Sequence, residues 1–591
     1  MSGRGTALRV VGSSLMLLLG MAIPGHAEAA EGDRILSAMK QELERSRTLK
    51  VPSLEAPYFI EYTLDDAEAF SVSATLGGVV STSNNKFRLP GVQVRVGDYQ
   101  FDNTNYTRSG SPLSGDQFPI EDSLEVMRRF FWLATDRAYK SAVESIARKR
   151  AALKNVTLSE NTPDFAKAEA SRVVLASGSG RLDRDQWTAR VRSLSQLFAA
   201  YPELLDSMVE FQGVRSTRYQ VNTEGTEVRV PEVLAFLRAQ ASIQAADGMV
   251  LQDTVLFPAL DFDRMPAEAD LSRAVKLLAE NMTRLAKAPL GEDYAGPVIF
   301  EGQAAGQFFA QVLGKNLVLF RKPVTDPGQP GSFPTSELEG RIGAKILPEW
   351  MDVVDDPTQK EWRGRPLFGQ YEVDLEGVRP QPLPVVEKGV LKSFLLTRQP
   401  VKTFASSNGR ARLPGVFGAK TAGFSNLFVR PAEVVPSEEL KTKMVELLKS
   451  RGKPYGILIR KMDFPFGGSF DEIRRMLVRH AQAGASGKAA SPPVLAYKVY
   501  ADGREEMVRG LQFRALSARS MKDILAASDE LHAFEFMDNG APLSISGGGG
   551  YVAEACVVAP SVLVDDLELR RHDDELPKTP TVPAPTIVVS R

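Results

Sequence analysis

A single cysteine, Cys556, in a chain of 591 residues constrains the fold more than any other feature of the sequence. One thiol cannot form an intrachain disulfide, even in an oxidising compartment, so the folded state depends on packed apolar cores. Apolar residues make up 43% of the chain, which is enough to build them. Because single cores stop growing near ~250–300 residues, we expect at least two domains.

The first 29 residues have the pattern of an export signal. Arg4 and Arg9 precede an apolar core at residues 10–23, and Ala27-Glu28-Ala29 forms a small-x-small cleavage site. The apolar core is too short to span a bilayer comfortably, so we expect no stable membrane insertion. The sequence therefore predicts a signal peptide at residues 1–29 and an exported protein, periplasmic or, as an alternative, extracellular.

The charge balance argues against a nucleic-acid partner. Removing residues 1–29 takes two basic and one acidic residue from totals of 72 and 73, which leaves 70 basic and 72 acidic residues. A nearly neutral chain offers no general attraction for nucleic acid or for an anionic membrane surface.

The first half of the mature chain mixes helices and strands. Apolar periodicity predicts helices at residues 33–49, 121–150, 185–211 and 268–287, strands at 58–64 and 92–96, and a hairpin over 214–230 that turns at 222–225. Pro289 and Gly291 follow the last helix, so we place a domain boundary near residue 290. Residues 30–290 are thus expected to form a mixed α/β domain.

The second half is expected to be rich in strands, within an α+β protein of two domains. Strands or hairpins are predicted at residues 371–375, 384–397, 455–460, 494–513 and 544–569. One helix interrupts them, with Ser437 as its predicted N-cap and Gly452 at its end. Residues 291–570 form this predicted domain. Residues 326–334 and 481–493 have loop compositions, and the proline-rich tail at 571–591 is expected to be disordered.

Residues 297–315, PVIFEGQAAGQFFAQVLGK, carry the most specific pattern in the chain. We interpret residues 297–300 as a short buried strand, 302–306 as a turn of small residues, and Gln307 as the start of an apolar helix. A strand, a tight turn and a helix in this order often position a functional site.

This segment resembles the TldD/PmbA family, which is named for a proposed modulator of DNA gyrase and is related to metallopeptidases. Further similar elements follow in the family's order at residues 407–410, 509–513 and 521–526. Active members carry H-E-x-x-x-H after the same strand and turn. Residue-by-residue matching places Ala310, Gln311 and Lys315 at the His, Glu and His positions of that motif. The chain therefore resembles the branch that lacks the motif.

The three substitutions remove the chemistry that the motif provides. Ala310 has no lone pair, and Lys315 presents an ammonium where a neutral imidazole would bind zinc. Gln311 cannot accept a proton from metal-bound water, which is the work of the motif's Glu. We therefore expect no catalytic residue, no metal and no other cofactor, although the resemblance implies zinc in active relatives.

The remaining potential ligands are scattered. The family's third ligand, a cysteine, would fall near Ser546 and Gly547, about ten residues before Cys556. The four histidines are His26, His480, His532 and His572, and no two of them lie within five residues of each other. Local histidine pairs are the usual sign of a zinc site, so the sequence offers no replacement.

Three functions are consistent with these residues. The first is a metal-free subunit that grips extended peptides by strand addition and supports proteolysis by a motif-bearing partner, because the family pairs subunits of both kinds. The second is an atypical peptidase that uses scattered ligands or Lys315 as a fixed cation. The third is a homodimeric envelope protein that binds peptides or acts as a scaffold. The resemblance thus implies a homodimer, or a heterodimer with a TldD-like paralogue, and a peptide substrate.

Overall fold

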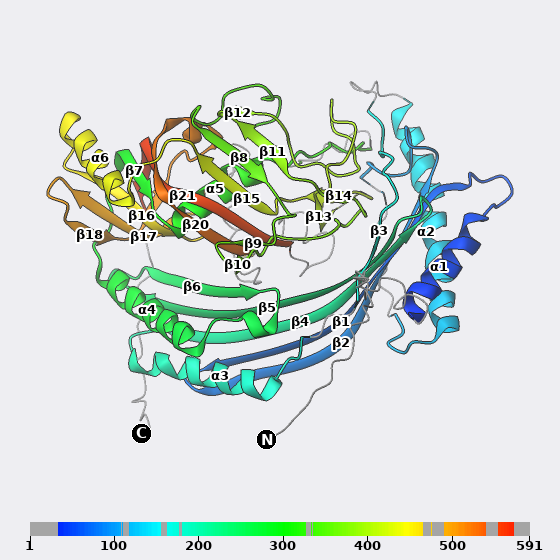
Figure 1. The fold of residues 1–591 in the computed structure, drawn as a ribbon, viewed down its shortest axis with the longest axis horizontal. Coiled ribbons are helices and arrows are strands. Elements are labelled where there is room, and N and C mark those ends of the chain that lie inside the picture. The colour runs from blue at the N-terminus through cyan, green and yellow to red at the C-terminus, as the bar shows by residue number, and fades with distance from the viewer. Residues whose placement is uncertain are drawn as a thin grey trace, which may run out of the picture.

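The computed structural model describes residues 33–572, except 108, 110–117, 155–161, 177–179, 327–332, 334, 416, 465–473, 475–489 and 539–552. Two large sheets dominate it, one from the first half of the chain and one from the second. Figure 1 shows the first sheet as a long curved layer beneath the second. The predicted α+β architecture of two domains is therefore confirmed.

The first sheet has the strand order β2-β1-β4-β5-β3, and β6 also pairs with β5. Its strands are β1 (Pro57–Thr75), β2 (Gly78–Val96), β3 (Arg172–Val174), β4 (Asp206–Asn222), β5 (Glu227–Gln244) and β6 (Val250–Ala259). All the pairs are antiparallel except β3 with β5. Since β1, β2, β4 and β5 are each 17 to 19 residues long, the sheet forms an extended curved surface.

Four helices cover parts of this sheet and bury its apolar side chains. They are α1 (Arg34–Arg47), α2 (Leu124–Leu153), α3 (Arg184–Gln196) and α4 (Glu268–Lys287). The helices α1 and α2 pack at one end of the sheet around Met39 and Phe131, whereas α3 and α4 pack around Val191 and Leu278. Each helix has an apolar face, which explains why periodicity predicts the positions of α1, α2 and α4 well and the start of α3.

The second sheet contains the strand order β12-β11-β8-β15-β21-β7-β16-β17-β18, and β19 and β20 also pair with β21. Its strands are β7 (Tyr294–Phe300), β8 (Met351–Asp355), β11 (Leu383–Glu387), β12 (Val390–Leu391), β15 (Asn426–Pro431), β16 (Tyr455–Met462), β17 (Pro493–Tyr500), β18 (Glu505–Val508), β19 (Leu511–Phe513), β20 (Ile524–Asp538) and β21 (Ala553–Arg571). Two small hairpins, β9 (Glu361–Trp362) with β10 (Arg365–Pro366) and β13 (Ala411–Pro414) with β14 (Lys420–Ala422), lie outside it. Among the described residues, helices that pack with this sheet are α5 (Gln303–Val312), which is buried in the largest core, and α6 (Ser437–Ser450).

Buried charged side chains join the two halves of the chain. Arg398 is 1% exposed and donates from Nε and Nη2 to the carbonyl oxygen of Ala166, at 2.9 and 2.7 Å. Lys461 forms an ion pair with Asp253 at 2.6 Å. Removing one partner from such a buried pair leaves an uncompensated charge, so these contacts fix the relative placement of the halves.

Two predictions in the first half of the chain need correction. The region 185–211 is not one helix, because α3 ends at Gln196 and β4 begins at Asp206. The alternating burial of Val209 and Phe211 is the strand period, which a helical reading overlooks. The strands at 58–64 and 92–96 are only the paired ends of β1 and β2, which form one long hairpin that turns at Leu76 and Gly77.

Three local predictions in the second half are wrong. Residues 371–375 form no strand, because Asp374 Oδ1 accepts hydrogen bonds from the backbone N–H groups of Glu376 and Val378 and closes a turn. Residues 302–306 are not a turn, since α5 begins at Gln303. Ser437 is the first residue of α6 rather than its cap, and Pro436 takes the cap position without a side-chain hydrogen bond.

Several predicted features lie outside the described residues. They are the signal peptide at 1–29, most of the loops at 326–334 and 481–493, residues 544–552 of the last predicted strand, and the tail beyond His572. Among the described residues, no helix combines the length and apolar character needed to cross a membrane.

Candidate functional site

The strand β7 and the helix α5 form the centre of the candidate site. β7 lies between β21 and β16, and Val298 and Phe300 are fully buried. Gly302 then adopts φ +57°, and a Cβ added to it would meet no atom within 4 Å, so glycine is needed there for the sharp change of direction before α5 rather than for space. Gly306 lies so close to β20 that an added Cβ would be 2.3 Å from Phe534 Cβ.

Gln307 ties α5 to the end of β16. Its side chain is 0% exposed, donates from Nε2 to Met462 O at 3.1 Å and accepts from Met462 N at 2.8 Å. The amide thus replaces a strand partner for Met462, and both polar ends of the buried side chain are satisfied. The sequence gives no sign of this role, because Gln307 looks like one polar residue at the start of an apolar helix.

The structure places the three motif positions along the last turn of α5 and the 3₁₀ turn that follows. Ala310 is 0% exposed, and its methyl group belongs to the core. Gln311 Oε1 accepts a hydrogen bond from Ser491 N at 2.8 Å, just before β17. Gln311 Nε2 is buried and has no partner among the described residues. Lys315 lies in the 3₁₀ turn Gly314–Asn316.

Lys315 forms an ion pair with Asp538, the last residue of β20. The side chain of Asp538 is 9% exposed and that of Lys315 is 31% exposed, so the pair is largely removed from water. The aspartate is 223 positions away in sequence, and no local pattern identifies it. The ammonium group at the last motif position is therefore matched by a carboxylate supplied by the neighbouring strand.

These residues do not fit a zinc ion. Ala310 has no donor atom, the oxygen of Gln311 is engaged by a backbone N–H, and Lys315 brings a positive charge to the position of an imidazole. In the part of the chain that the structure describes, no group of three His, Cys, Asp or Glu side chains is arranged to hold a metal. Ser546 and Gly547, where the family's third ligand would fall, lie outside the described residues.

The other candidate ligands are dispersed as well. His532 Nε2 is 3.9 Å from Glu530 Oε2, and His572 Nδ1 shares a hydrogen bond with Gln512 at 2.8 Å. Cys556 is 0% exposed, and burial raises the pKa of its thiol well above the usual range. A buried thiol of this kind is inert. His26 and His480 lie outside the described residues.

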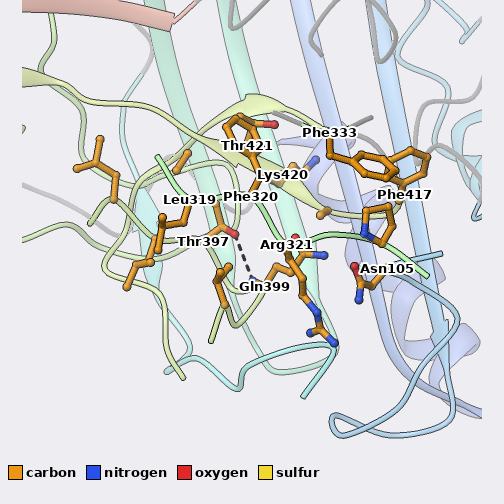
Figure 2. Close-up of a pocket in the computed structure, with 16 residues that line it drawn as sticks. Asn105, Leu319, Phe320, Arg321, Phe333, Thr397, Gln399, Phe417, Lys420 and Thr421 are labelled. Carbon is orange, nitrogen blue, oxygen red and sulfur yellow. Dashed lines mark hydrogen bonds between the residues drawn. The ribbon is translucent and has the colours of Figure 1, made fainter. Parts of the chain in front are cut away.

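Two cavities lie near the two ends of the segment. Beyond Lys315, a cavity of about 50 Å³ is lined by Phe320, Phe333, Phe417, Lys420 and other residues. Figure 2 shows Phe333 and Phe417 side by side at its wall, and their ring centroids are 6.0 Å apart. A more open cavity of about 380 Å³ lies at the N-terminal end of α5, where Gly302 and Gln303 line it.

The fold and the site define a two-domain α+β protein with a strand and a buried helix at the centre of its second domain. A family model described as the PmbA/TldA metallopeptidase C-terminal domain matches residues 293–463, which include this strand and helix. Residues 293–463 thus form a metallopeptidase-related domain of this family, and the predicted resemblance to the TldD/PmbA family is confirmed.

Curated relatives match over limited regions. A metalloprotease from Archaeoglobus fulgidus is 42% identical over 79 residues, which are 13% of this chain and 17% of the relative. A metalloprotease from Methanothermobacter thermautotrophicus is 24% identical over 241 residues, which are 40% of this chain and 48% of the relative. The chain thus spans less than half the length of these curated relatives.

Solved structures match over nearly the whole fold. TldE from Thermococcus kodakarensis has a TM-score of 0.53 and 11% identity, and the match covers 90% of this chain and 99% of that one. A proposed modulator of a DNA gyrase from Thermotoga maritima has a TM-score of 0.54 and 15% identity, with coverages of 86% and 96%. At this level of identity the likeness shows the fold alone.

Proposed function

We propose that this chain is an exported, metal-free subunit of the TldD/PmbA family that supports the proteolysis of extended peptides by a motif-bearing partner. The observation that carries the proposal is the state of the three motif positions. One is a core methyl group, one is an amide held by Ser491, and one is an ammonium group paired with Asp538.

The ion pair makes the binding of a metal ion at this site unfavourable. A zinc ion placed near Lys315 would meet a like charge, and displacing the ammonium would break its ion pair with the buried carboxylate of Asp538. Gln311 cannot act as a general base, because an amide does not accept a proton from water near neutral pH. The site therefore supports binding better than hydrolysis.

The region beyond Lys315 supports peptide binding. The strand β14 pairs only with β13 among the described residues, which leaves its other edge without a strand partner there. Lys420 and Thr421 of β14 line the cavity that Phe333 and Phe417 enclose. An extended peptide could add main-chain hydrogen bonds along β14 while one apolar side chain enters the aromatic cavity.

The alternative in which Lys315 acts as a fixed cation toward a peptide carbonyl has less support. Pairing with Asp538 already neutralises the ammonium, and a catalytic cation is most effective when its charge is directed at the developing oxyanion. A peptide-cleavage assay of the isolated chain, with and without chelator, separates the two functions. The proposal predicts no cleavage in either condition, whereas chelator-resistant cleavage that Lys315→Met abolishes would establish the alternative.

Co-purification from the native source tests the proposed partnership. We expect a homologue with an intact H-E-x-x-x-H motif to be recovered with the tagged chain, and we expect the mixture to cleave unfolded peptides faster than the homologue alone. Recovery of this chain without any homologue, together with no effect on cleavage, would contradict the proposal. Export is tested separately, since N-terminal sequencing of the mature protein should begin at Ala30.

A further inference from the structure

The open cavity of about 380 Å³ lies where two parallel strands of the second sheet stop pairing. The strands β7 and β16 pair in parallel up to Phe300 and Ile459, and the residues that follow, Glu301 and Arg460, line the cavity. Phe300 packs with α5 on one face of the sheet, whereas Ile299 packs with α6 on the other face. In α/β sheets, ligands bind beyond the carboxyl ends of parallel strands at such a change of face.

Both of these helices begin at the cavity. Gly302 and Gln303 at the start of α5 line it, and so does Ser437 at the start of α6. Neither helix start is capped by a side chain, and the first turn of α5 contains no acidic residue. A Cβ added to Gly302 would meet no atom within 4 Å, so the start of α5 faces open space. The positive ends of two helix dipoles therefore meet at one cavity, where they favour a negatively charged group.

Two serine hydroxyls of the lining can donate further hydrogen bonds. Ser437 Oγ is buried and has no hydrogen-bond partner among the described residues. Ser561 is 2% exposed, and its Oγ accepts from Gly302 N at 2.9 Å. The hydroxyl hydrogen of Ser561 has no acceptor in the described part of the chain. Because buried polar groups are nearly always paired in native proteins, these two donors are suited to the acceptor atoms of a ligand.

The basic side chains of the lining are already balanced by acidic ones. Arg460 forms ion pairs with Glu301 at 2.6 Å and with Glu505 at 2.9 Å. Lys441 forms an ion pair with Glu505 at 2.8 Å. Two cations thus face two carboxylates, so this part of the wall adds no net charge. The attraction for an anion comes from the helix starts and the hydroxyls instead.

Glu530 adds a carboxylate that is not balanced in this way. Among the described residues, its ion-pair contact is with His532 at 3.9 Å, and both side chains line the cavity. They lie next to a stretch between Ala527 and Leu531 where β20 departs from regular pairing with β21, and such irregularities redirect side chains. The same stretch holds the start of α6 in place, since Val435 N donates to Ala527 O at 2.9 Å. The cavity therefore presents fixed donors together with one carboxylate that suits a cation.

We infer that this cavity binds a small zwitterion, namely the free α-carboxylate and α-ammonium groups of an amino acid or a dipeptide. The carboxylate accepts from the two serine hydroxyls and the start of α5, while the ammonium pairs with Glu530. Ile299 and Leu440 also line the cavity, so it suits an apolar side chain. Inorganic phosphate suits it less well, because phosphate has no ammonium for Glu530 and its second charge would meet Glu301.

This site is separate from the positions of the family motif. It lies at the start of α5, whereas Ala310, Gln311 and Lys315 lie at the end of the helix and beyond it. Ten helical residues span about 15 Å. The inference does not depend on the proposed function, since it concerns a ligand of this chain alone and needs no partner.

Isothermal titration calorimetry of the mature chain tests the inference with two probes, leucine and glycyl-leucine. We expect saturable binding of at least one probe, and the tighter one shows whether the site is built for an amino acid or a dipeptide. Leucinamide lacks the carboxylate and N-acetyl-leucine lacks the ammonium, so each should bind at least about tenfold more weakly than leucine, as should inorganic phosphate.

Ser437→Ala distinguishes a ligand site from a structural role. Because Ser437 Oγ has no partner among the described residues, its removal should leave the thermal unfolding temperature unchanged or slightly higher. The same variant should bind the tighter probe at least about tenfold more weakly. The matched control is Ser450→Ala at the other end of α6, where the hydroxyl donates to Leu447 O, and it should bind as the wild type does.

Glu530→Gln tests the other end of the ligand. It should weaken the binding of leucine and leave the binding of N-acetyl-leucine unchanged, because only leucine has the ammonium. The inference would be overturned by a wild type that binds neither probe saturably, or by leucinamide or phosphate binding as tightly as the probes. A stably folded Ser437→Ala variant with wild-type affinity would overturn it as well.

Discussion

The ion pair between Lys315 and Asp538 can be measured by a double-mutant cycle. The variants are Lys315→Met, Asp538→Asn and the double variant, which remove the charges while keeping similar side-chain volumes. The pair lies between two known limits, because exposed pairs contribute about 0–1 kcal/mol and breaking a buried pair costs about 3–5 kcal/mol. With Asp538 at 9% and Lys315 at 31% exposure, we expect Lys315→Met to lower the free energy of unfolding by about 2 kcal/mol and the coupling energy to be about 1–2 kcal/mol.

Urea unfolding at neutral pH gives these free energies, provided that the slope with denaturant is the same for all four proteins. The matched control is the Lys345 and Glu349 pair, whose side chains are 54% and 76% exposed with 3.3 Å between Nζ and Oε2. Its coupling should be about 0.3–0.5 kcal/mol and should fall with added salt, whereas the Lys315 coupling should change little. A Lys315 coupling no larger than the control, or a Lys315→Met variant as stable as the wild type, would refute the assignment of a structural cation.

Two further predictions concern the surroundings of α5 and the buried acids. Gly306→Ala should destabilise the second domain by about 2 kcal/mol or more, since the new Cβ would lie 2.3 Å from Phe534 Cβ, while Gly302→Ala should cost only about 1 kcal/mol of backbone strain, and thermal unfolding of both variants compares the two. Equal effects would show that α5 can move away from β20. Burial raises the pKa of Glu535 from its usual 4.5 to about 7, against the opposing charge of Arg365. The folded state therefore binds the extra proton, and about 1–3 kcal/mol of stability that is present below pH 4.5 should be lost as the pH rises to about 7. Glu535→Gln should flatten this part of the stability profile, and an unchanged profile would show that Glu535 is ionised throughout.

The sequence predicts the helices and strands in which apolar residues recur at a regular spacing of a few residues. The helices α1, α4 and α6, and the strands β7, β16 and β17, begin and end close to their predicted positions. The hairpin of β4 and β5 turns where Asn222 and Gly225 indicate it, because Asn222 Oδ1 accepts from the N–H groups of Glu224 and Thr226. These features depend on local spacing and turn chemistry, which a single sequence contains.

Elements without a clear buried face are missed. The first half of β2, Gly78 to Lys86, is exposed on both sides except for Ser83, so its residues show no alternation. β20 has irregular pairing with β21 between Ala527 and Leu531, which interrupts its period. Neither pattern can be recognised until the partner strand is known.

In the candidate site, too, the sequence predicts some features and misses others. Its motif positions follow from the order of strand, small residues and helix, and the sequence correctly identifies the family. The partner Asp538 ends the strand β20 and Ser491 lies just before β17, both far away in the chain, and each is one residue among many of its type. Local sequence therefore locates the site, while its electrostatic state depends on long-range contacts.

Metal analysis of the purified mature chain tests the central claim most directly. The protein is purified with excess zinc, dialysed and measured for bound zinc per chain, with Lys315→His as a variant that restores one motif ligand. We predict well below one zinc per chain in the wild type and no change in thermal stability when chelator is added. One tightly bound zinc per wild-type chain, lost together with thermal stability on chelation, would contradict the account.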